Sequence, residues 1–228
     1  MATIRTGWLP QIRVDKPWRP RRGLWVALLG PDGVGKSSVI AALGHGELAG
    51  FAACRSYHLR PTLLRSRKGR ANTCPHATEP RSLVVSAAKL LHLLLANWLG
   101  YLLAVRGPVA RGNLVLMDRY FHDCLVDERR YRLPKSCRGL AKLVARLVPQ
   151  PDLLVLLDAP TEILQMRKGE VTWGESERQR IAYRELGRTF PNACIVSSAG
   201  PLAEALDSVV DCIIEARLAA QRPGYRPA

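Results

Sequence analysis

Acidic side chains are scarce in this sequence. Asp and Glu number 19 against 34 Lys and Arg, which gives the 228 residues a formal net charge of +15 and a pI near 10.2. A charge of this sign attracts phosphate groups of any origin, whether they belong to a nucleotide, a nucleic acid or an anionic lipid. Nucleic-acid binding has no support in the sequence besides this charge, so we do not expect it.

Closely spaced cysteines and an N-terminal apolar segment are also missing. The six cysteines stand at positions 54, 74, 124, 137, 194 and 212, and no two lie within four residues of each other. This spacing excludes a C-x-x-C redox motif and the usual zinc-ligand patterns. Residues 1–23 are basic and contain three prolines, unlike the apolar centre of a signal peptide. We therefore expect reduced, structural thiols and a cytoplasmic protein.

No apolar run is long enough to predict a membrane-spanning helix. The sixteen residues 90–105 include only His92 and Asn97 as strongly polar side chains, but a spanning helix needs roughly 20 residues. Basic residues flank the run on both sides. The segment 82–105 has the longest helical pattern in the chain, and we expect a helix buried in the core rather than one at a membrane interface.

The sequence does contain an alternation of strand and helix patterns. Short apolar runs are typical of strands buried on both faces, and they occur at 24–29, 51–57, 113–117, 152–157 and 194–197. Helical patterns occur at 37–49, 82–105, 140–148, 161–168, 175–189 and 201–220. This order predicts an α/β fold, a parallel sheet of about five strands with helices on both faces. We expect a basic arm (1–23), one domain (24–220) and a Pro/Gly tail (221–228).

A glycine-rich loop follows the first predicted strand. Residues 30–38 read G-P-D-G-V-G-K-S-S, which fits the phosphate-loop (P-loop, Walker A) pattern G-x-x-x-x-G-K-[ST] and not the dinucleotide fingerprint G-x-G-x-x-G. The glycines let the backbone curl so that its N–H groups point at phosphate oxygens, and the next helix adds the positive end of its dipole. The predicted nucleotide contacts are Gly30, Asp32, Gly33, Val34, Gly35, Lys36, Ser37 and Ser38.

Individual side chains at this edge of the sheet have separate expected roles. Lys36 is placed to reach the β- and γ-phosphates, and the Ser37 hydroxyl to ligate Mg²⁺. Asp118 ends an apolar strand, where a carboxylate can hold Mg²⁺ through water, and Arg119 offers a forked donor to phosphate. Asp32 is repelled by a triphosphate unless it points away, so it either accepts a hydrogen bond from an acceptor hydroxyl or caps the turn.

The chain resembles the thymidylate kinase family of P-loop nucleoside monophosphate kinases. The resemblance rests on three motifs: G-P-D-G-V-G-K-S-S (30–38), D-R-Y (118–120) and P-D-L-L-V-L-L-D-A-P (151–160). It covers about residues 24–220 and implies a P-loop kinase domain that uses ATP and Mg²⁺. It also implies that Asp118 helps hold the magnesium–nucleotide, that Arg119 contacts the transferred or acceptor phosphate, and that Asp158 lies beside the active cleft.

The part of the family pattern that grips the acceptor differs here. Family members carry Thr-Arg-Glu-Pro after the second strand, where this chain has His58-Leu59-Arg60-Pro61. They also carry an Asp-Arg in the long helix, and the family's spacing places that pair at Ala96-Asn97 here. The chain looks closer to a divergent subgroup, marked by R-R-Y-R (129–132), whose genes often accompany bacterial polysaccharide synthesis. The candidates for contact with the acceptor are Asp32, Arg60, Arg119 and Tyr120.

Positive charge over the moving phosphate is expected from a mobile lid. The loop position that carries an arginine in some family members is Gly33 here, and phosphoryl transfer needs such a charge in the transition state. Arg167 and Arg178 are the candidates, with Arg180 and Arg184 behind them.

These features predict an ATP-dependent phosphotransferase that is similar to thymidylate kinase. It would move the γ-phosphate of Mg·ATP to a small, anionic acceptor, either a nucleoside monophosphate or a sugar or glycan precursor. The alternative is a nucleotide-binding module with weak catalysis that acts in an assembly. The sequence leaves open the acceptor, contact of the basic arm with a membrane surface, and a homodimer.

Overall fold

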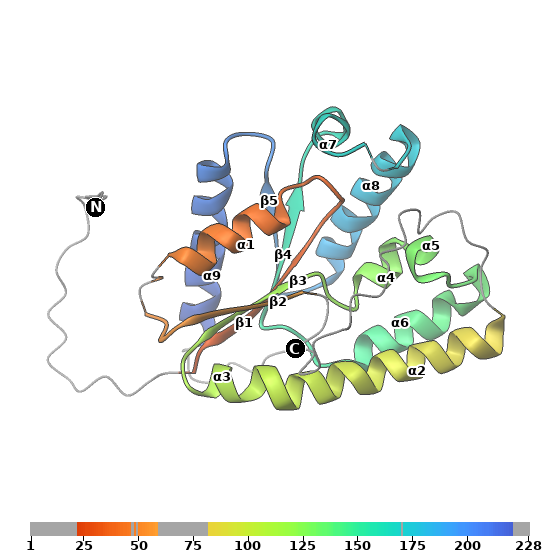
Figure 1. Ribbon diagram of the computed structural model, residues 1–228, viewed down its shortest axis with the longest axis horizontal. Coiled ribbons are helices and arrows are strands. Elements are labelled where there is room, and N and C mark those ends of the chain that lie inside the picture. Colours follow the sequence, from red (N-terminus) through yellow and green to blue (C-terminus); the bar gives the residue numbers. More distant parts are fainter. Residues whose placement is uncertain (1–21, 47, 49, 59–81, 170, 221–228) are drawn as a thin grey trace, which may run out of the picture.

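The computed structural model of the chain (Figure 1) describes residues 22–46, 48, 50–58, 82–169 and 171–220. The described residues form a parallel sheet of five strands in the order β2-β3-β1-β4-β5, with helices on both faces, which confirms the predicted fold class. Its strands are β1 (Leu24–Leu29), β2 (Cys54–His58), β3 (Leu114–Asp118), β4 (Leu153–Asp158) and β5 (Ala193–Ser197).

Strand β1 lies at the centre of the sheet, between β3 and β4, and all six of its residues are buried. From β1 the chain builds β2 and β3 on one side and β4 and β5 on the other. A parallel sheet leaves a crevice outside the carboxyl ends of its strands at such a switch point. The glycine-rich loop therefore leaves β1 where a ligand of this fold is expected.

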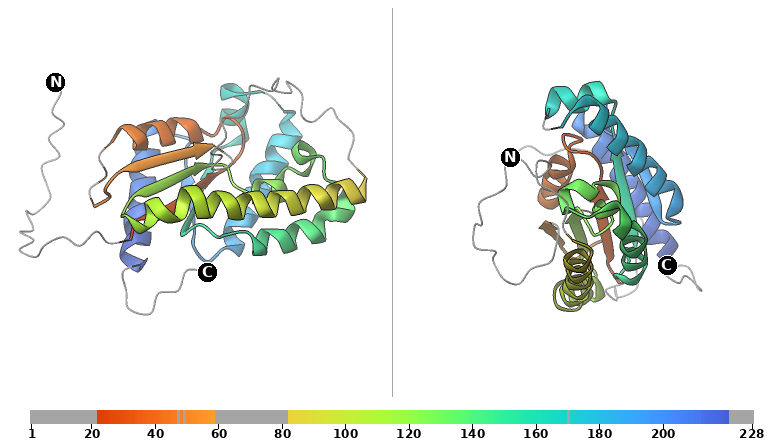
Figure 2. Two further views of the ribbon diagram at one scale, coloured as in Figure 1. Left: turned by 60° about the horizontal axis from the view of Figure 1, so that its bottom comes forward. Right: turned by 90° about the vertical axis from the view of Figure 1, so that its right-hand side faces the viewer.

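Helices cover the two faces of the sheet (Figures 1 and 2). One face carries α1 (Lys36–His45) and α9 (Leu202–Ala220); the other carries α2 (Leu83–Gly100), α4 (Asp123–Val126), α6 (Arg138–Leu147) and α8 (Trp173–Thr189). Helix α2 continues through a π-helical turn, η2 (Tyr101–Val105), into α3 (Arg106–Ala110). The shorter elements are α5 (Glu128–Tyr131), the 3₁₀ turn η3 (Lys135–Cys137) and α7 (Thr161–Arg167).

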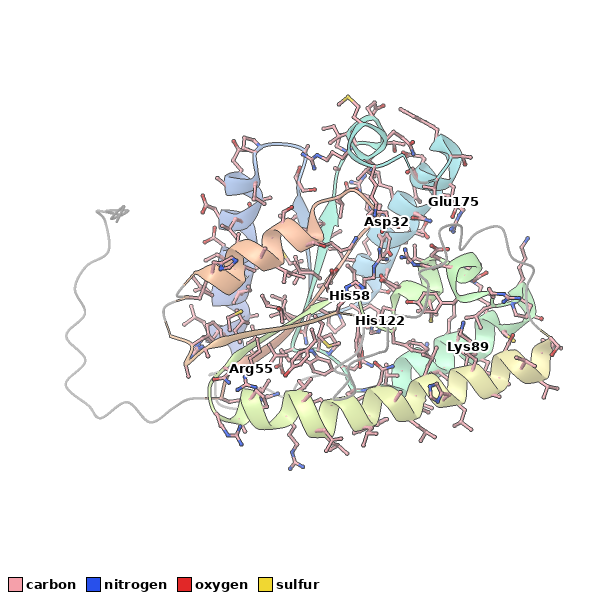
Figure 3. All side chains as sticks on the ribbon, viewed as in Figure 1. Asp32, Arg55, His58, Lys89, His122 and Glu175 are labelled. Atoms are coloured by element: carbon pink, nitrogen blue, oxygen red, sulfur yellow. A yellow bond between two sulfur atoms is a disulfide. The ribbon has the colours of Figure 1, made fainter. Side chains whose placement is uncertain are left out.

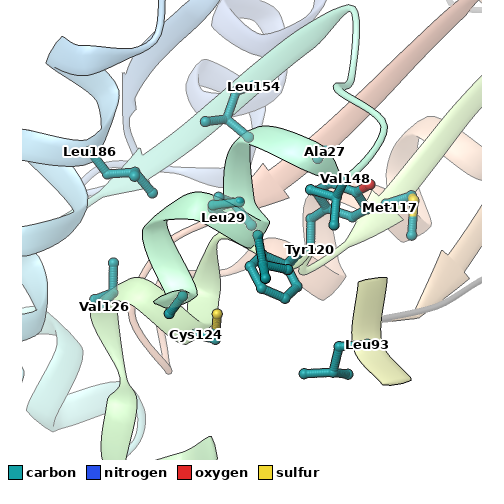
Figure 4. Packing of buried hydrophobic residues seen from close by; sticks show 14 of the residues in the cluster. Ala27, Leu29, Leu93, Met117, Tyr120, Cys124, Val126, Val148, Leu154 and Leu186 are labelled. Atoms are coloured by element: carbon teal, nitrogen blue, oxygen red, sulfur yellow. The ribbon is translucent and has the colours of Figure 1, made fainter. Parts of the chain in front are cut away.

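Alternate residues of the strands enter two separate cores. Ala27 and Leu29 of β1 join the core beneath α2, α6 and α8, part of which Figure 4 shows. Val26 and Leu28 join the core beneath α1 and α9. Burial on both sides explains why the strands read as continuous apolar runs instead of alternating ones.

The predicted helix over 82–105 is present, but the expectation that it is buried is wrong for its outer side. Leu90 and Leu93 face the core and are 0% and 3% exposed, whereas Leu95 and Leu99 are 61% and 59% exposed. Because apolar residues lie all round the helix, their spacing does not reveal which side the rest of the protein covers.

A disulfide joins Cys194 of β5 to Cys212 of α9, so the expectation of reduced thiols is wrong for this pair. The two Cα atoms lie 6.6 Å apart, although the residues are 18 positions apart in the sequence, because α9 packs back along β5. Cys54, Cys124 and Cys137 are free thiols, and the last two are buried. The cytoplasmic location stays a prediction.

Candidate active site

The P-loop between β1 and α1 has a backbone shape that requires its glycines. Gly30, Gly33 and Gly35 have φ angles of 144°, 84° and 97°, a region that glycine enters without steric cost. A Cβ atom on Gly30 would lie 2.5 Å from the carbonyl oxygen of Leu157. Gly35 ends the loop, and α1 begins at the next residue, so the N-terminus of this ten-residue helix opens into the crevice.

The Lys36 side chain crosses the loop from within. It is 6% exposed, and its Nζ donates hydrogen bonds to the carbonyl oxygens of Gly30 at 2.7 Å and Pro31 at 2.8 Å. Burial, with the nearby Arg119 as a second cause, lowers the pKa of Lys36 to about 8. The Lys36 side chain is therefore a charged ammonium group at neutral pH, and it lies beside the backbone amides of the loop that can bind an anion.

Ser37, Asp118 and His58 meet at the carboxyl ends of β1, β2 and β3. The Ser37 hydroxyl donates to Asp118 Oδ2 at 3.3 Å, and His58 Nδ1 lies 3.0 Å from the same oxygen. His58 and Asp118 are partners in the β2–β3 register, and Figure 3 shows His58 at this edge of the sheet.

This corner fits a magnesium ion. The Ser37 hydroxyl and Asp118 Oδ2 offer two oxygen ligands 3.3 Å apart, and Asp118 Oδ1 beside them is buried with no hydrogen-bond partner among the described residues. The described residues contain no group of three or more His, Cys, Asp or Glu side chains that could hold a metal ion by themselves. Mg²⁺ needs none, since in phosphate sites it takes one or two protein oxygens and completes its shell with water and phosphate.

Asp32 is held by two arginines. Arg119 Nη2 pairs with its Oδ1, and Arg130 Nη1 donates to its Oδ2 at 2.9 Å. Burial by itself would raise the pKa of Asp32, but the two guanidinium groups and Lys36 outweigh burial and lower that pKa to about 2. Asp32 is therefore a carboxylate whose bonds go to another segment, and not a cap of its own turn.

Arg119 is fixed from its other side by a wholly buried acid. Its Nη1 lies 3.5 Å from Asp123 Oδ2, and Tyr183 of α8 donates a hydrogen bond to Asp123 Oδ1 at 2.9 Å. Burial raises the pKa of Asp123 and is opposed by Arg119. Arg119 has a φ of 74°, so the backbone itself turns sharply to aim this side chain. The segment that begins with D-R-Y and continues to Asp123 (118–123, D-R-Y-F-H-D) thus holds the Arg119 guanidinium group between two carboxylates.

A cavity of about 570 Å³ joins these groups, which is a size that suits a small ligand. The predicted residues that line it are Asp32, Gly33, Val34, Gly35, Lys36, Ser37, Ser38, Asp118, Arg119 and Arg167. Sequence analysis did not assign a role to Arg130, Lys168 or Ser198, which also line it. Arg130 belongs to the R-R-Y-R motif, but nothing in that motif distinguishes the arginine that turns inward from its neighbours.

Four predicted site residues have different outcomes. Gly30 begins the P-loop but does not line the cavity. Tyr120 does not line the cavity: its large apolar ring packs edge-on against Trp25 in the core, and its hydroxyl donates to the Pro149 carbonyl at 2.6 Å. Arg178 does not line it either, because it donates to Glu175 and to the carbonyl of Val126. Arg60, the basic arm up to residue 21 and the tail from residue 221 lie outside the described residues.

Of the other arginines predicted for the lid, one lines the cavity and two, on α8, contact Asp158. Arg167 lines the cavity and donates to the Ser198 carbonyl at 2.9 Å. Arg180 and Arg184 reach Asp158, at 2.9 Å and 3.8 Å. Asp158 thus anchors α8 to the end of β4 and is not the cap of a helix.

Two solved structures of thymidylate kinases share this architecture. The enzyme from Candida albicans has a TM-score of 0.58 at 17% sequence identity, over 85% of this chain and 90% of that chain. The enzyme from Ehrlichia chaffeensis has a TM-score of 0.53 at 13% identity, over 88% of this chain and 100% of that chain. The chain has a thymidylate kinase fold.

The likeness is one of fold, since no protein-family model and no curated sequence matches the chain. Within the thymidylate kinase fold, the P-loop, the end of β3, the end of α7 and the start of α9 surround one cavity. The fold supports nucleotide binding of the kinase type, and the acceptor has to be argued from the residues themselves.

Proposed function

We propose that the protein is a kinase that transfers the γ-phosphate of Mg·ATP to a small anionic acceptor. The observation that carries this proposal is that two sets of basic groups line one cavity. The P-loop with Lys36 would bind one anion, and Arg119 with Arg130 would bind the other. Phosphoryl transfer needs this arrangement, because both substrates are anions that have to approach each other in line.

On the nucleotide side, the loop amides and Lys36 would hold the β- and γ-phosphates. A phosphate oxygen can replace the carbonyl oxygens of Gly30 and Pro31 as the partner of Lys36 Nζ. Ser37 and Asp118 would hold Mg²⁺, which supplies charge neutralisation between the β- and γ-phosphates.

On the acceptor side, Arg119 and Arg130 would bind an anionic group of the acceptor. The long helix offers no arginine here: Asn97 stands at the family position, is buried, and donates to the Leu93 carbonyl at 2.7 Å. Arg130, which is 34% exposed, supplies from another segment the charge that the helix lacks. We infer that an arginine at position 130, in place of one on the long helix, changes where the anionic group of the acceptor binds and therefore which acceptor fits.

Asp32 would orient these arginines and not remove a proton. A carboxylate with a pKa near 2 is a weak base at neutral pH. An acceptor that is already ionised, such as a phosphate monoester, needs no base, because its oxygen attacks the γ-phosphorus directly while the bond to ADP breaks. Arg167, the arginine of α7 that lines the cavity, would place a positive charge next to the phosphoryl group during its transfer.

The test is ADP release in the presence of a panel of acceptors. We expect release to depend on acceptors that carry a phosphate, among nucleoside monophosphates, sugar phosphates and polyprenyl phosphates. Lys36→Ala should lower the rate by roughly 10²-fold or more, while Lys142→Ala, an exposed lysine of α6 outside the cavity, should leave it unchanged.

A nucleotide-binding module without turnover is the rival function, and the missing arginine at Asn97 favours it. That rival predicts binding of Mg·ATP with no ADP release for any acceptor in the panel. Release that requires one class of acceptor would exclude it.

A further inference from the structure

A second cavity lies between α6 and α8, on the face of the sheet that α4 also covers. Its volume is about 530 Å³, which is within the range of small-ligand sites. It shares no lining residue with the cavity at the P-loop. Helix α4 lies between α6 and α8 (Figure 1), and its Leu125 and Val126 line the space. We call this space the α6–α8 cavity.

The floor of the α6–α8 cavity belongs to the hydrophobic core. Leu154 of β4, Ala145 of α6 and Leu186 of α8 line it and are 2%, 4% and 9% exposed. Phe190, which follows α8, forms a half-buried wall, and its ring packs edge-on against the buried His122 ring with the centroids 4.5 Å apart. The fold thus presents a defined apolar surface, and an apolar chain placed on it is removed from water.

One wall of the α6–α8 cavity is basic. Arg138, Lys142 and Arg146 of α6 are spaced by four positions, so they share one side of the helix, and all three line the cavity with exposed side chains. Like charges at this spacing repel each other and destabilise a helix. Arg138 pairs with Glu128. An anion bound by Lys142 and Arg146 would relieve the repulsion that remains.

Acidic side chains are few around this wall. The sequence has no Asp or Glu between residues 129 and 151, and Glu185 is the one acid among the described residues that line the α6–α8 cavity. Within the described part of the chain, neither Lys142 nor Arg146 has an ion-pair partner. The wall therefore keeps an excess of positive charge beside an apolar floor.

We propose that the α6–α8 cavity binds an amphipathic anion, a molecule with one apolar chain and an anionic head. The chain would lie on the floor formed by Ala145, Leu154 and Leu186, and the head would accept hydrogen bonds from Lys142 and Arg146. A purely apolar ligand would leave the basic wall without a partner, and a small anion would leave the floor uncovered. The site is separate from the proposed kinase site, so its occupation is measured without nucleotide or turnover.

The experiment is titration calorimetry with decanoate, below its micelle-forming concentration and without nucleotide. Decanoate should bind at least tenfold more tightly than decanol, which lacks the anionic head, and at least tenfold more tightly than acetate, which lacks the chain. Absence of heat with decanoate would overturn the proposal. Equal affinity for decanol or for acetate would overturn it as well, because the head or the chain would then contribute nothing.

A charge reversal tests where the head binds. Lys142→Glu/Arg146→Glu should weaken decanoate binding more than tenfold. The matched control is Arg111→Glu/Arg188→Glu, which changes the net charge equally at two exposed arginines that do not line the α6–α8 cavity, and it should bind decanoate like the unchanged protein. A similar loss in both variants would show that decanoate responds only to the net charge of the protein, which would overturn the site.

Filling the α6–α8 cavity tests where the chain binds. Ala182→Phe adds a ring from a half-buried position of α8 that lines the cavity, and it should weaken decanoate binding more than tenfold. Ala203→Phe, at an exposed position of α9, should not, and thermal unfolding checks that both variants are folded. Unchanged affinity in a folded Ala182→Phe would place the chain elsewhere. A dimer that Ala182→Phe separates into monomers in sedimentation velocity would assign the cavity to a second copy of the chain instead.

Discussion

Single charged residues decide what the cavity can hold. The arrangement places Lys36 on the P-loop side and Arg119 with Arg130 on the other, while Asp32 is neutralised by its partners. Changes to Lys36 and to Arg130 should therefore have different effects, the first on the binding of ATP and the second on the binding of the acceptor.

The protonation of Lys36 should control ATP affinity at alkaline pH. Burial lowers its pKa to about 8, so the free protein loses this ammonium as the pH rises through that value, and phosphates bind the charged form better. We expect the Kd for Mg·ATP, measured by calorimetry, to weaken by up to about tenfold per pH unit above pH 8. In Lys36→Met the affinity should be low and flat over the same range; a profile as steep as that of the unchanged protein would show that another group titrates.

Arg130 should act on the acceptor and not on ATP. Removing a charge-assisted hydrogen bond costs about 1.5–3 kcal/mol, so Arg130→Ala should raise the KM for the acceptor roughly 10- to 100-fold with little change in the KM for ATP. Arg138→Ala is the control, because that arginine is 64% exposed and pairs with Glu128 outside the cavity. An equal rise in both KM values would mean that Arg130 maintains the loop instead of binding the acceptor.

At the scale of elements, α8 depends on close contact with the sheet. A Cβ atom on Gly187 would lie 2.2 Å from Leu156 Cδ1 in the fully buried core, whereas one on Gly174 of the same helix meets nothing within 4 Å. Gly187→Ala should destabilise the fold by about 1–3 kcal/mol, and Gly174→Ala should stabilise it by up to about 1 kcal/mol. Urea unfolding checks both; a stabilising Gly187→Ala would contradict this packing.

The elements themselves are largely predictable because their cause is local. The strand expected at 24–29 matches β1 residue for residue, and those expected at 113–117 and 152–157 are displaced by one residue from β3 and β4. The short helices α4 and α5 were not predicted, since four residues are too few to show a helical period. The exposed side of α2 was also not predicted, because burial of one side depends on what packs there.

The residues of the site are likewise predictable where their cause is local and not predictable where it depends on distant parts of the chain. The P-loop residues are recognisable because a contiguous motif shapes the backbone. Asp118 and Arg119 are recognisable because Asp118 ends an apolar strand and Arg119 comes directly after it. Arg130 reaches Asp32 across 98 positions of sequence, and only the fold reveals that approach. Tyr120, a predicted acceptor contact, instead lies in the core, where its ring packs against Trp25.

At the scale of the whole molecule, the cavity lies at the carboxyl edge of the sheet, away from the outer side of α2 (Figure 1). Ligand binding to the cavity should therefore stabilise the fold without help from the outer side of α2. At a concentration 100 times the Kd, Mg·ATP should add about 2.7 kcal/mol to the free energy of unfolding. Thermal unfolding should show the same gain for Leu95→Glu/Leu99→Glu; a gain that this variant loses would couple the two surfaces.

Titration calorimetry with Mg·ATP tests most directly whether the P-loop holds a nucleoside triphosphate. The unchanged protein should bind one equivalent with measurable heat, and Lys36→Ala, which retains the loop but removes its buried ammonium, should bind at least tenfold more weakly. Absence of heat in the unchanged protein, or equal affinity in Lys36→Ala, would contradict the proposed kinase site.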